Sequence, residues 1–122
     1  ILLEDNHLEI QKLLPYEKRG TILLMMADEK YTIVETTNGK HILRMSLGDA
    51  AQKISADQGF RVHRSYWVRY DYVKKIIYEN GNPKLLLLND DVIPLSRKLV
   101  NMTREKLADM NNSEIMTLSE IQ

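Results

Sequence analysis

The residues best suited to chemistry lie between Phe60 and Lys98, where arginines and lysines alternate with aromatic side chains. This stretch opens with FRVHRSYWVRYDYVKKI and closes with IPLSRK, just before a helical pattern. Cations interleaved with aromatic rings on strand-like segments are typical of surfaces that lie against nucleic acid, because the cations neutralise phosphates. The stretch is therefore the first candidate for a functional site.

Positive charge is concentrated in the same region, although the formal net charge of the chain is zero. Residues 1–59 carry seven Lys and Arg against nine Asp and Glu, residues 60–106 carry ten against five, and residues 107–122 carry none against three. Binding responds to the local potential within roughly 8–10 Å, the Debye length at moderate salt. The basic middle segment therefore matters more than the neutral total.

His63 and Asp71, with Ser65 or Ser96, raise the question of nucleophilic catalysis. No glycine elbow surrounds either serine, and a strand histidine more often hydrogen-bonds the backbone to fix a turn. The histidines are scattered without the spacing of a metal site, and the chain has no cysteine. We therefore expect no enzymatic activity, no cofactor and no metal.

Hydrophobic patterns place the candidate residues on strands and short helices. A strand is predicted at 21–27, followed by a hairpin of 31–37 and 41–45 across Asn38-Gly39, which favours a type I′ turn. Ser46 can cap a short helix whose apolar residues are Leu47, Ala50, Ala51 and Ile54. Further extended segments are predicted at 60–62, 65–70 and 73–79, with a second hairpin of 84–88 and 92–95.

Alternation along the basic segment predicts which of its side chains share a face. If residues 60–66 form one continuous strand, Arg61, His63 and Ser65 lie on one face, and Val62, Arg64 and Tyr66 on the other. Of the neighbouring aromatics Tyr66 and Trp67, one must face inward, and core packing is the default for it. Base stacking by this pair is the alternative.

The predicted organisation is a mainly β domain with two or three short helices. Residues 2–14 form an amphipathic helical pattern that either packs on the domain or ends a linker. We expect an N-terminal helix or linker at 1–19, the domain at 20–107, and an acidic, flexible tail at 108–122. Because the chain starts at Ile1, we expect it to be a fragment of a longer protein.

Taken together, FRVHRSYWVRYDYVKKI and IPLSRK resemble the LytTR-type DNA-binding domain of bacterial response regulators. The HRSY and SRK segments are fairly specific in combination, and DEKYTIVETTNGKHILRMSLGDAAQKI is similar to the family's first hairpin and following helix. The resemblance covers roughly residues 20–107. The matching positions are Phe60, Val62, His63, Arg64, Ser65, Tyr66, Val68, Val73, Ile76, Pro94, Ser96 and Arg97.

The resemblance implies an elongated architecture of about ten short strands in small antiparallel sheets. It also implies double-stranded DNA as the partner, sequence-specific binding as the output of a transcriptional regulator, and side chains that reach successive major grooves. The implied base-reading residues are Lys30, Arg69 and Arg97. The implied phosphate contacts are Tyr31, Arg64, Ser96 and Lys98.

Two of these positions depart from the family pattern. Lys30 falls where relatives often have His, and Arg69 where many have Asn. Arginine pairs best with guanine, so we expect either more guanine contact or more phosphate contact than is usual for the family. We also expect Lys30, Arg69 and Arg97 to converge on one side of the molecule.

Other classes of function stay open at this point. The chain could be a protein-interaction or dimerisation module that binds no DNA, or a binder of RNA or single strands. The absence of cysteine and of an apolar run near 18 residues favours the cytoplasm and gives this fragment no membrane contact, while an upstream anchor in a longer chain stays open. A homodimer is expected through the N-terminal helix or a missing upstream domain.

Overall fold

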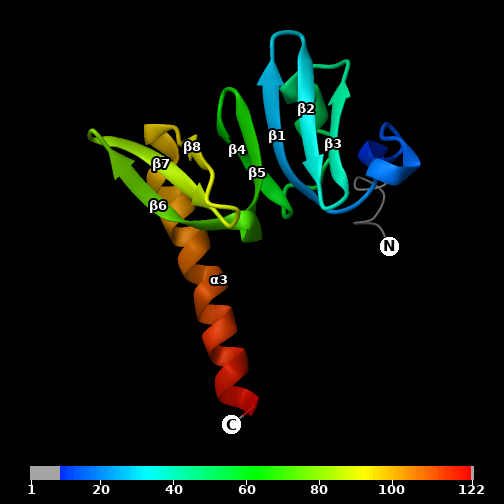
Figure 1. The fold of residues 1–122 in the computed structure, drawn as a ribbon. Coiled ribbons are helices and arrows are strands. Elements are labelled where there is room, and N and C mark those ends of the chain that lie inside the picture. Colours follow the sequence, from blue (N-terminus) through cyan, green and yellow to red (C-terminus); the bar gives the residue numbers. More distant parts are fainter. Residues whose placement is uncertain (1–8, 122) are drawn as a thin grey trace. The chain divides into compact units, whose positions relative to one another are not determined.

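The computed structural model describes residues 9–121, with side chains up to Met110, and it is mainly β (Figure 1). These residues contain eight strands in two antiparallel sheets, one of five strands and one of three. The predicted fold class is confirmed, with eight strands in place of about ten. The chain divides into two compact units, Ile1–Val73 and Lys74–Gln122.

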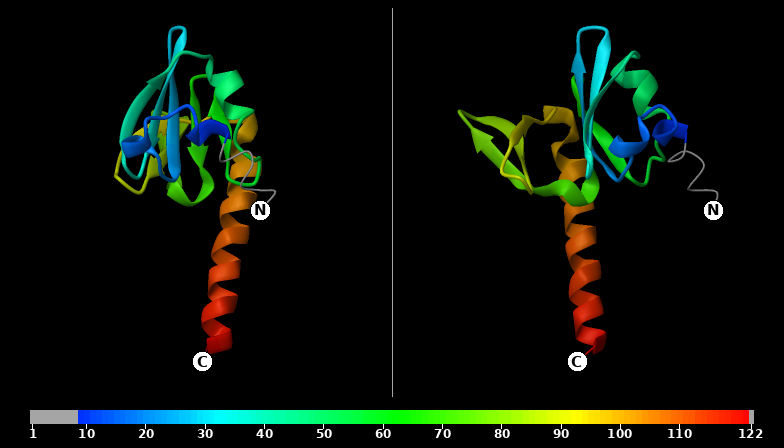
Figure 2. Two further views of the ribbon diagram at one scale, coloured as in Figure 1. Left: turned by 90° about the vertical axis from the view of Figure 1, so that its right-hand side faces the viewer. Right: turned by 45° about the vertical axis from the view of Figure 1, so that its right-hand side comes forward.

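The first unit is built on the five-stranded sheet, whose strand order is β3-β2-β1-β5-β4. Its strands are β1 (Ile22–Asp28), β2 (Tyr31–Thr36), β3 (Gly39–Leu43), β4 (Gly59–His63) and β5 (Tyr66–Arg69). Buried and exposed positions alternate along β2, as expected for a strand with one face against a core. Figure 2 shows the short helix α2 (Leu47–Ala51) beside one face of this sheet.

The core of the first unit lies between that sheet face and α2. Met25, Val34 and Trp67 from the sheet cluster with apolar residues of α2 and the segment after it. Trp67 is 2% exposed, so the core role predicted for one of the two neighbouring aromatics is confirmed for Trp67. The predicted cap is also present, because Ser46 Oγ accepts a hydrogen bond from the Asp49 backbone at 3.1 Å.

Part of the N-terminal segment packs against this unit. Residues 9–11 are helical, and Ile10 and Leu14 belong to the buried cluster. Gln11 accepts a hydrogen bond from the Gly20 backbone at 3.1 Å, which ties the segment to the start of the sheet. Residues 1–8 of the predicted helix lie outside the described residues. A short 3-10 helix, η1 (Tyr16–Lys18), follows.

The turn between β2 and β3 differs from the predicted type I′ turn. Thr36 pairs with Gly39, so the loop consists of Thr37 and Asn38, and Gly39 has a φ of 123° while Asn38 does not have a positive φ. Asn38 is held otherwise: its backbone N–H donates to Thr36 Oγ1 at 2.9 Å, and its side chain donates to the Arg19 carbonyl. These bonds fix the loop without a left-handed asparagine, and the type I′ prediction is wrong.

Residues 60–66 do not form one continuous strand. β4 ends at His63, Arg64 and Ser65 form a turn, and the register shifts between Arg61 and His63. The predicted division of residues 61–66 between two faces is therefore wrong. The histidine role is confirmed, because the Ser65 backbone N–H donates to His63 Nδ1 at 3.2 Å and so fixes the turn.

The second unit contains the three-stranded sheet and the C-terminal helix. Its strands follow the order β6 (Val73–Glu79), β7 (Asn82–Leu87) and β8 (Val92–Pro94), which includes the predicted second hairpin. β6 begins at the unit boundary, directly after the 3-10 helix η2 (Tyr70–Tyr72). η3 (Arg97–Leu99) leads into α3 (Val100–Ile121). The helix runs through the predicted tail, and the flexibility of residues 108–122 stays a prediction.

Candidate nucleic-acid interface

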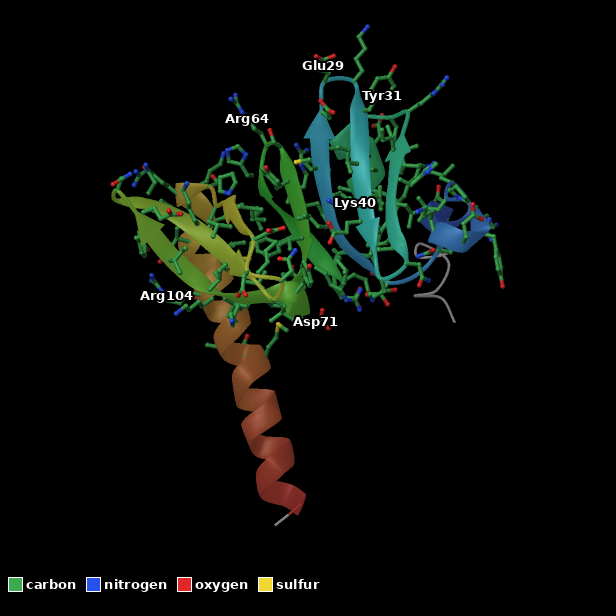
Figure 3. The ribbon with its side chains drawn as sticks, in the orientation of Figure 1. Glu29, Tyr31, Lys40, Arg64, Asp71 and Arg104 are labelled. Carbon is green, nitrogen blue, oxygen red and sulfur yellow. The ribbon has the colours of Figure 1, made fainter. Side chains whose placement is uncertain are left out.

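The β1–β2 hairpin carries Lys30 at its tip. Asp28 pairs with Tyr31, so the turn consists of Glu29 and Lys30, and Glu29 adopts a φ of 55°. Lys30 is exposed, and within the described residues its ammonium has no hydrogen bond or ion pair. Tyr31 is 43% exposed at the start of β2, and Figure 3 shows Glu29 and Tyr31 at this tip.

The β4–β5 turn lies at the same end of the five-stranded sheet and carries Arg64. Met26 on β1 pairs with Tyr66 on β5, and the Ala27 backbone donates to the Ser65 carbonyl at 2.8 Å. Arg61 Nη2 donates to the Arg64 carbonyl at 2.8 Å, which helps to fix the turn. We call this end, with residues 28–31 and 64–65, the loop end (Figure 3).

Arg64, like Lys30, has no hydrogen-bonding or ionic partner for its side chain among the described residues. That side chain is also exposed. Two cations from turns far apart in the sequence are thus available to an external anion at one end of one sheet. Such an arrangement can bind phosphates without first breaking internal ion pairs.

Arg69 occupies a different environment at the opposite end of the same sheet. It pairs with Gly59 across the β4–β5 hairpin, away from the turn, and Figure 3 shows Asp71 far from Arg64. Arg69 Nε lies 3.0 Å from Asp71 Oδ1, Nη1 donates to Gln58 Oε1 at 2.8 Å, and the side chain is 22% exposed. Lys30 and Arg69 are therefore not gathered at one end of the sheet.

Aromatic rings pack beside Arg69. Phe60 and Tyr70 stack with their ring centroids 4.9 Å apart. Burial raises the pKa of the Tyr70 phenol, and the nearby Asp57 carboxylate adds to the effect. The Tyr70 phenol therefore stays neutral at physiological pH and carries no charge that could pair with Arg69. The negative charge beside Arg69 is the carboxylate of Asp71.

Arg97 lies in the second unit, where β8 gives way to η3. It is exposed, and Nη2 donates to Asn82 Oδ1 at 2.6 Å and approaches the Gly81 carbonyl at 3.4 Å. The guanidinium is thereby linked to the β6–β7 turn. Lys98 is exposed and makes no ion pair among the residues with described side chains, while the Ser96 carbonyl accepts from the Leu99 backbone at 2.9 Å.

One exposed cation near the loop end is not singled out by the sequence patterns. Arg44 follows the last residue of β3 and, within residues 9–110, has no hydrogen-bonding or ionic partner. In the sequence it is an isolated arginine in HILRM, a segment that predicts a strand. Its position beside the β1–β2 hairpin follows from the strand register, which a single sequence does not reveal.

Comparisons with known proteins agree with the architecture. The family model of the LytTr DNA-binding domain matches residues 17–108, so the chain belongs to this family. It is a DNA-binding domain, and the resemblance carried by HRSY and SRK is confirmed. No curated protein matches the chain.

A solved structure shares the fold. It is the LytTr DNA-binding domain of a putative methyl-accepting/DNA response regulator from Bacillus cereus, with 23% identity and a TM-score of 0.60. The match covers 77% of this chain and 84% of that chain.

Neither α3 nor any other described helix combines the length and apolarity needed to span a membrane. In the same residues, no group of three His, Cys, Asp or Glu side chains is placed to hold a metal ion.

Proposed function

We propose that this domain binds specific sites in double-stranded DNA as the output domain of a bacterial transcriptional regulator in the cytoplasm. The observation that carries the proposal is the family match over residues 17–108. The loop end supports it, because Lys30 and Arg64 on two turns are exposed and, within residues 9–110, have no ion pair, so they can bind an external polyanion.

Lys30 is the proposed base-reading residue of the first unit. It lies at the tip of a two-residue turn, and its ammonium can donate to guanine O6 and N7 in the major groove. Tyr31 and Arg64 are proposed phosphate contacts at the same end. Contacts of this second kind position the protein on the duplex without reading its sequence.

Arg97 is the proposed base-reading residue of the second unit. Its contact with Asn82 uses one guanidinium nitrogen and leaves further N–H donors for a guanine or a phosphate. Lys98 and the Ser96 hydroxyl are proposed phosphate contacts beside it. We propose that the two units reach successive major grooves.

Arg69 is the third proposed base-reading residue, and its guanidinium is already bonded to two side chains of the protein. Asp71 and Gln58 occupy Nε and Nη1, which leaves the other N–H groups of the fork for DNA. A guanidinium fixed before binding loses less side-chain entropy when it meets a base. Asp71 and Gln58 are therefore proposed to orient Arg69 for reading.

The complete protein is proposed to act as a homodimer, joined through the N-terminal helix or an upstream domain. Tandem sites on DNA would then be bound with avidity, because the second contact becomes intramolecular. A non-DNA interaction module is the main alternative, and single-strand or RNA binding is the other. The burial of Trp67 disfavours stacking of bases on that ring.

Enrichment of bound duplexes from a random pool tests the proposal. The expected result is a recurrent motif containing guanines, with a selected duplex bound more tightly than its scrambled version. Bound duplexes without a common motif would contradict sequence-specific binding. Tighter binding of the corresponding single strand would favour the single-strand alternative.

A further inference from the structure

Arg44 is fixed beside the β1–β2 hairpin by the residues on both sides of it. Leu43 pairs with Thr32 in the β2–β3 ladder, and Thr32 Oγ1 donates to the Met45 carbonyl at 2.9 Å. The backbone of Arg44 therefore lies next to Thr32, one residue from Tyr31. Arg44 belongs to the edge of the loop end, on the β3 side.

One row of residues crosses the sheet at the base of the β1–β2 hairpin tip. Leu43 pairs with Thr32, Thr32 pairs with Ala27, and Ala27 donates to the carbonyl of Ser65. Arg44 adjoins one end of this row and Arg64 adjoins the other. From β3 to β5 the row crosses three strand spacings of about 4.8 Å, a width of about 14 Å.

The β1–β2 hairpin continues beyond this row, between the two arginines. It adds the pair Asp28–Tyr31 and the turn of Glu29 and Lys30, and Figure 1 shows the hairpin extending past the neighbouring strand ends. Two further residues of strand correspond to about 6–7 Å. The tip of the β1–β2 hairpin, residues 28–31, therefore forms a finger that projects from the loop end, with one arginine at each side of its base.

The charges differ between the hairpin tip and the positions on either side of it. The finger carries the exposed carboxylates of Asp28 and Glu29 beside Lys30, whereas each flank carries an arginine without an ion pair to any described side chain. Carboxylates are repelled by phosphates but can accept a hydrogen bond from the cytosine amino group in the major groove. The centre of the loop end thus suits base edges, and its flanks suit phosphates.

We propose that Arg44 and Arg64 contact the two phosphate backbones that border one major groove, with the β1–β2 finger inside that groove. The groove is about 12 Å wide, close to the span of the row that carries the arginines. The inference rests on the proposed function and adds Arg44, a binding residue on a third chain segment. It also assigns the two arginines to opposite DNA strands.

Single substitutions test the roles, using the 122-residue chain and a duplex enriched from a random pool. Arg44→Ala and Arg64→Ala should each weaken binding to selected and scrambled duplexes equally and reduce the salt slope by about one. Lys30→Ala should instead reduce the preference for the selected duplex by about tenfold. Lys40→Ala is the control for loss of a cation far from the loop end, since Lys40 is exposed at the other end of β3, 3.7 Å from Glu35.

Neutral methylphosphonates, placed at one phosphate at a time, test the strand assignment. At one phosphate on one DNA strand, a methylphosphonate should weaken binding of the original protein but not of Arg44→Ala. At one phosphate on the other strand, it should weaken binding of the original protein but not of Arg64→Ala. The inference is overturned if Arg44→Ala behaves like Lys40→Ala, or if both arginines respond to the same strand. If the protein without any substitution shows no salt-dependent binding to unmodified duplex, the proposed function itself is overturned.

Discussion

Two of the candidate base-reading cations differ in their surroundings. Lys30 projects from a turn without a partner among the described side chains, whereas Arg69 is partly buried and is bonded to Asp71 and Gln58. A free lysine contributes a mobile point charge, while a fixed guanidinium contributes a fork of defined direction. We therefore expect Arg69 to depend on its neighbours in a way that Lys30 does not.

Substitution of Asp71 by Asn tests that dependence. Removing a carboxylate raises general affinity for DNA, but it also releases the Arg69 fork from its ion pair. We expect Asp71→Asn to bind scrambled duplex more tightly and to discriminate less between selected and scrambled duplexes. Because Asp71 is 66% exposed, the stability change should stay within about 1 kcal/mol.

Glu17→Gln supplies the control for charge alone, since Glu17 is an exposed acid of the first unit. It should raise affinity for both duplexes without changing their ratio. An unchanged ratio for Asp71→Asn would contradict the orienting role, and the Arg69–Asp71 pair would then be a surface ion pair only. Equilibrium titrations with two labelled duplexes measure both quantities.

The sequence predicts single residues well where the chemistry is local. Lys30 is placed in its turn by the residues around it, and the role of His63 as a turn-fixing acceptor follows from general behaviour of strand histidines. Arg44 is missed because its neighbour Thr32 is twelve residues away, and only the β2–β3 register brings them together. The Arg69–Asp71 pair, by contrast, joins residues only two positions apart.

At the scale of elements, the β4–β5 hairpin packs too closely for a side chain at Gly59. A Cβ added there would meet the Val68 carbonyl and the Trp67 ring, both of which belong to the adjacent strand. Gly59→Ala should therefore destabilise the domain by about 1–3 kcal/mol, the usual cost of overpacking. Urea unfolding followed by Trp67 fluorescence measures this change in the free energy of unfolding.

Gly48→Ala is the matched control for that substitution. Gly48 lies within α2, and a Cβ there would meet only side-chain atoms at ordinary contact distances of 3.4 Å or more. Alanine in a helix is favoured over glycine by about 0.5–1 kcal/mol, so this variant should be as stable as the original or slightly more so. Equal stability of Gly59→Ala and Gly48→Ala would contradict the close packing of β4 on β5.

Elements are predicted where a local pattern and a packing face agree. The Ser46 cap and the buried residues of α2 follow directly from the sequence, and so does the β7–β8 hairpin. The predicted type of the β2–β3 turn is wrong because Asn38 is hydrogen-bonded to Arg19, nineteen residues away, and turn preferences take no account of such a bond. The separation of β4 from β5 also agrees with the extended segments predicted at 60–62 and 65–70, whereas their exact ends and the register shift between Arg61 and His63 do not follow from alternation.

At the scale of the whole molecule, the total charge is a poor guide to binding. The chain is formally neutral, yet it exposes Arg44, Arg64 and Lys30 around the loop end and two neighbouring cations, Arg97 and Lys98, in the second unit. Local potential governs association with DNA at distances below about 10 Å. A neutral domain can therefore bind a polyanion through separated basic sites.

The dependence of duplex binding on salt tests the central claim most directly. If the loop end and the Arg97 segment both neutralise phosphates, the logarithm of the association constant should fall linearly with the logarithm of salt concentration. Its slope should be about −0.9 for each phosphate neutralised, so the three cations assigned to phosphates, Arg44, Arg64 and Lys98, give about −2.7. Binding that is absent at low salt, or that shows no salt dependence, would contradict the account.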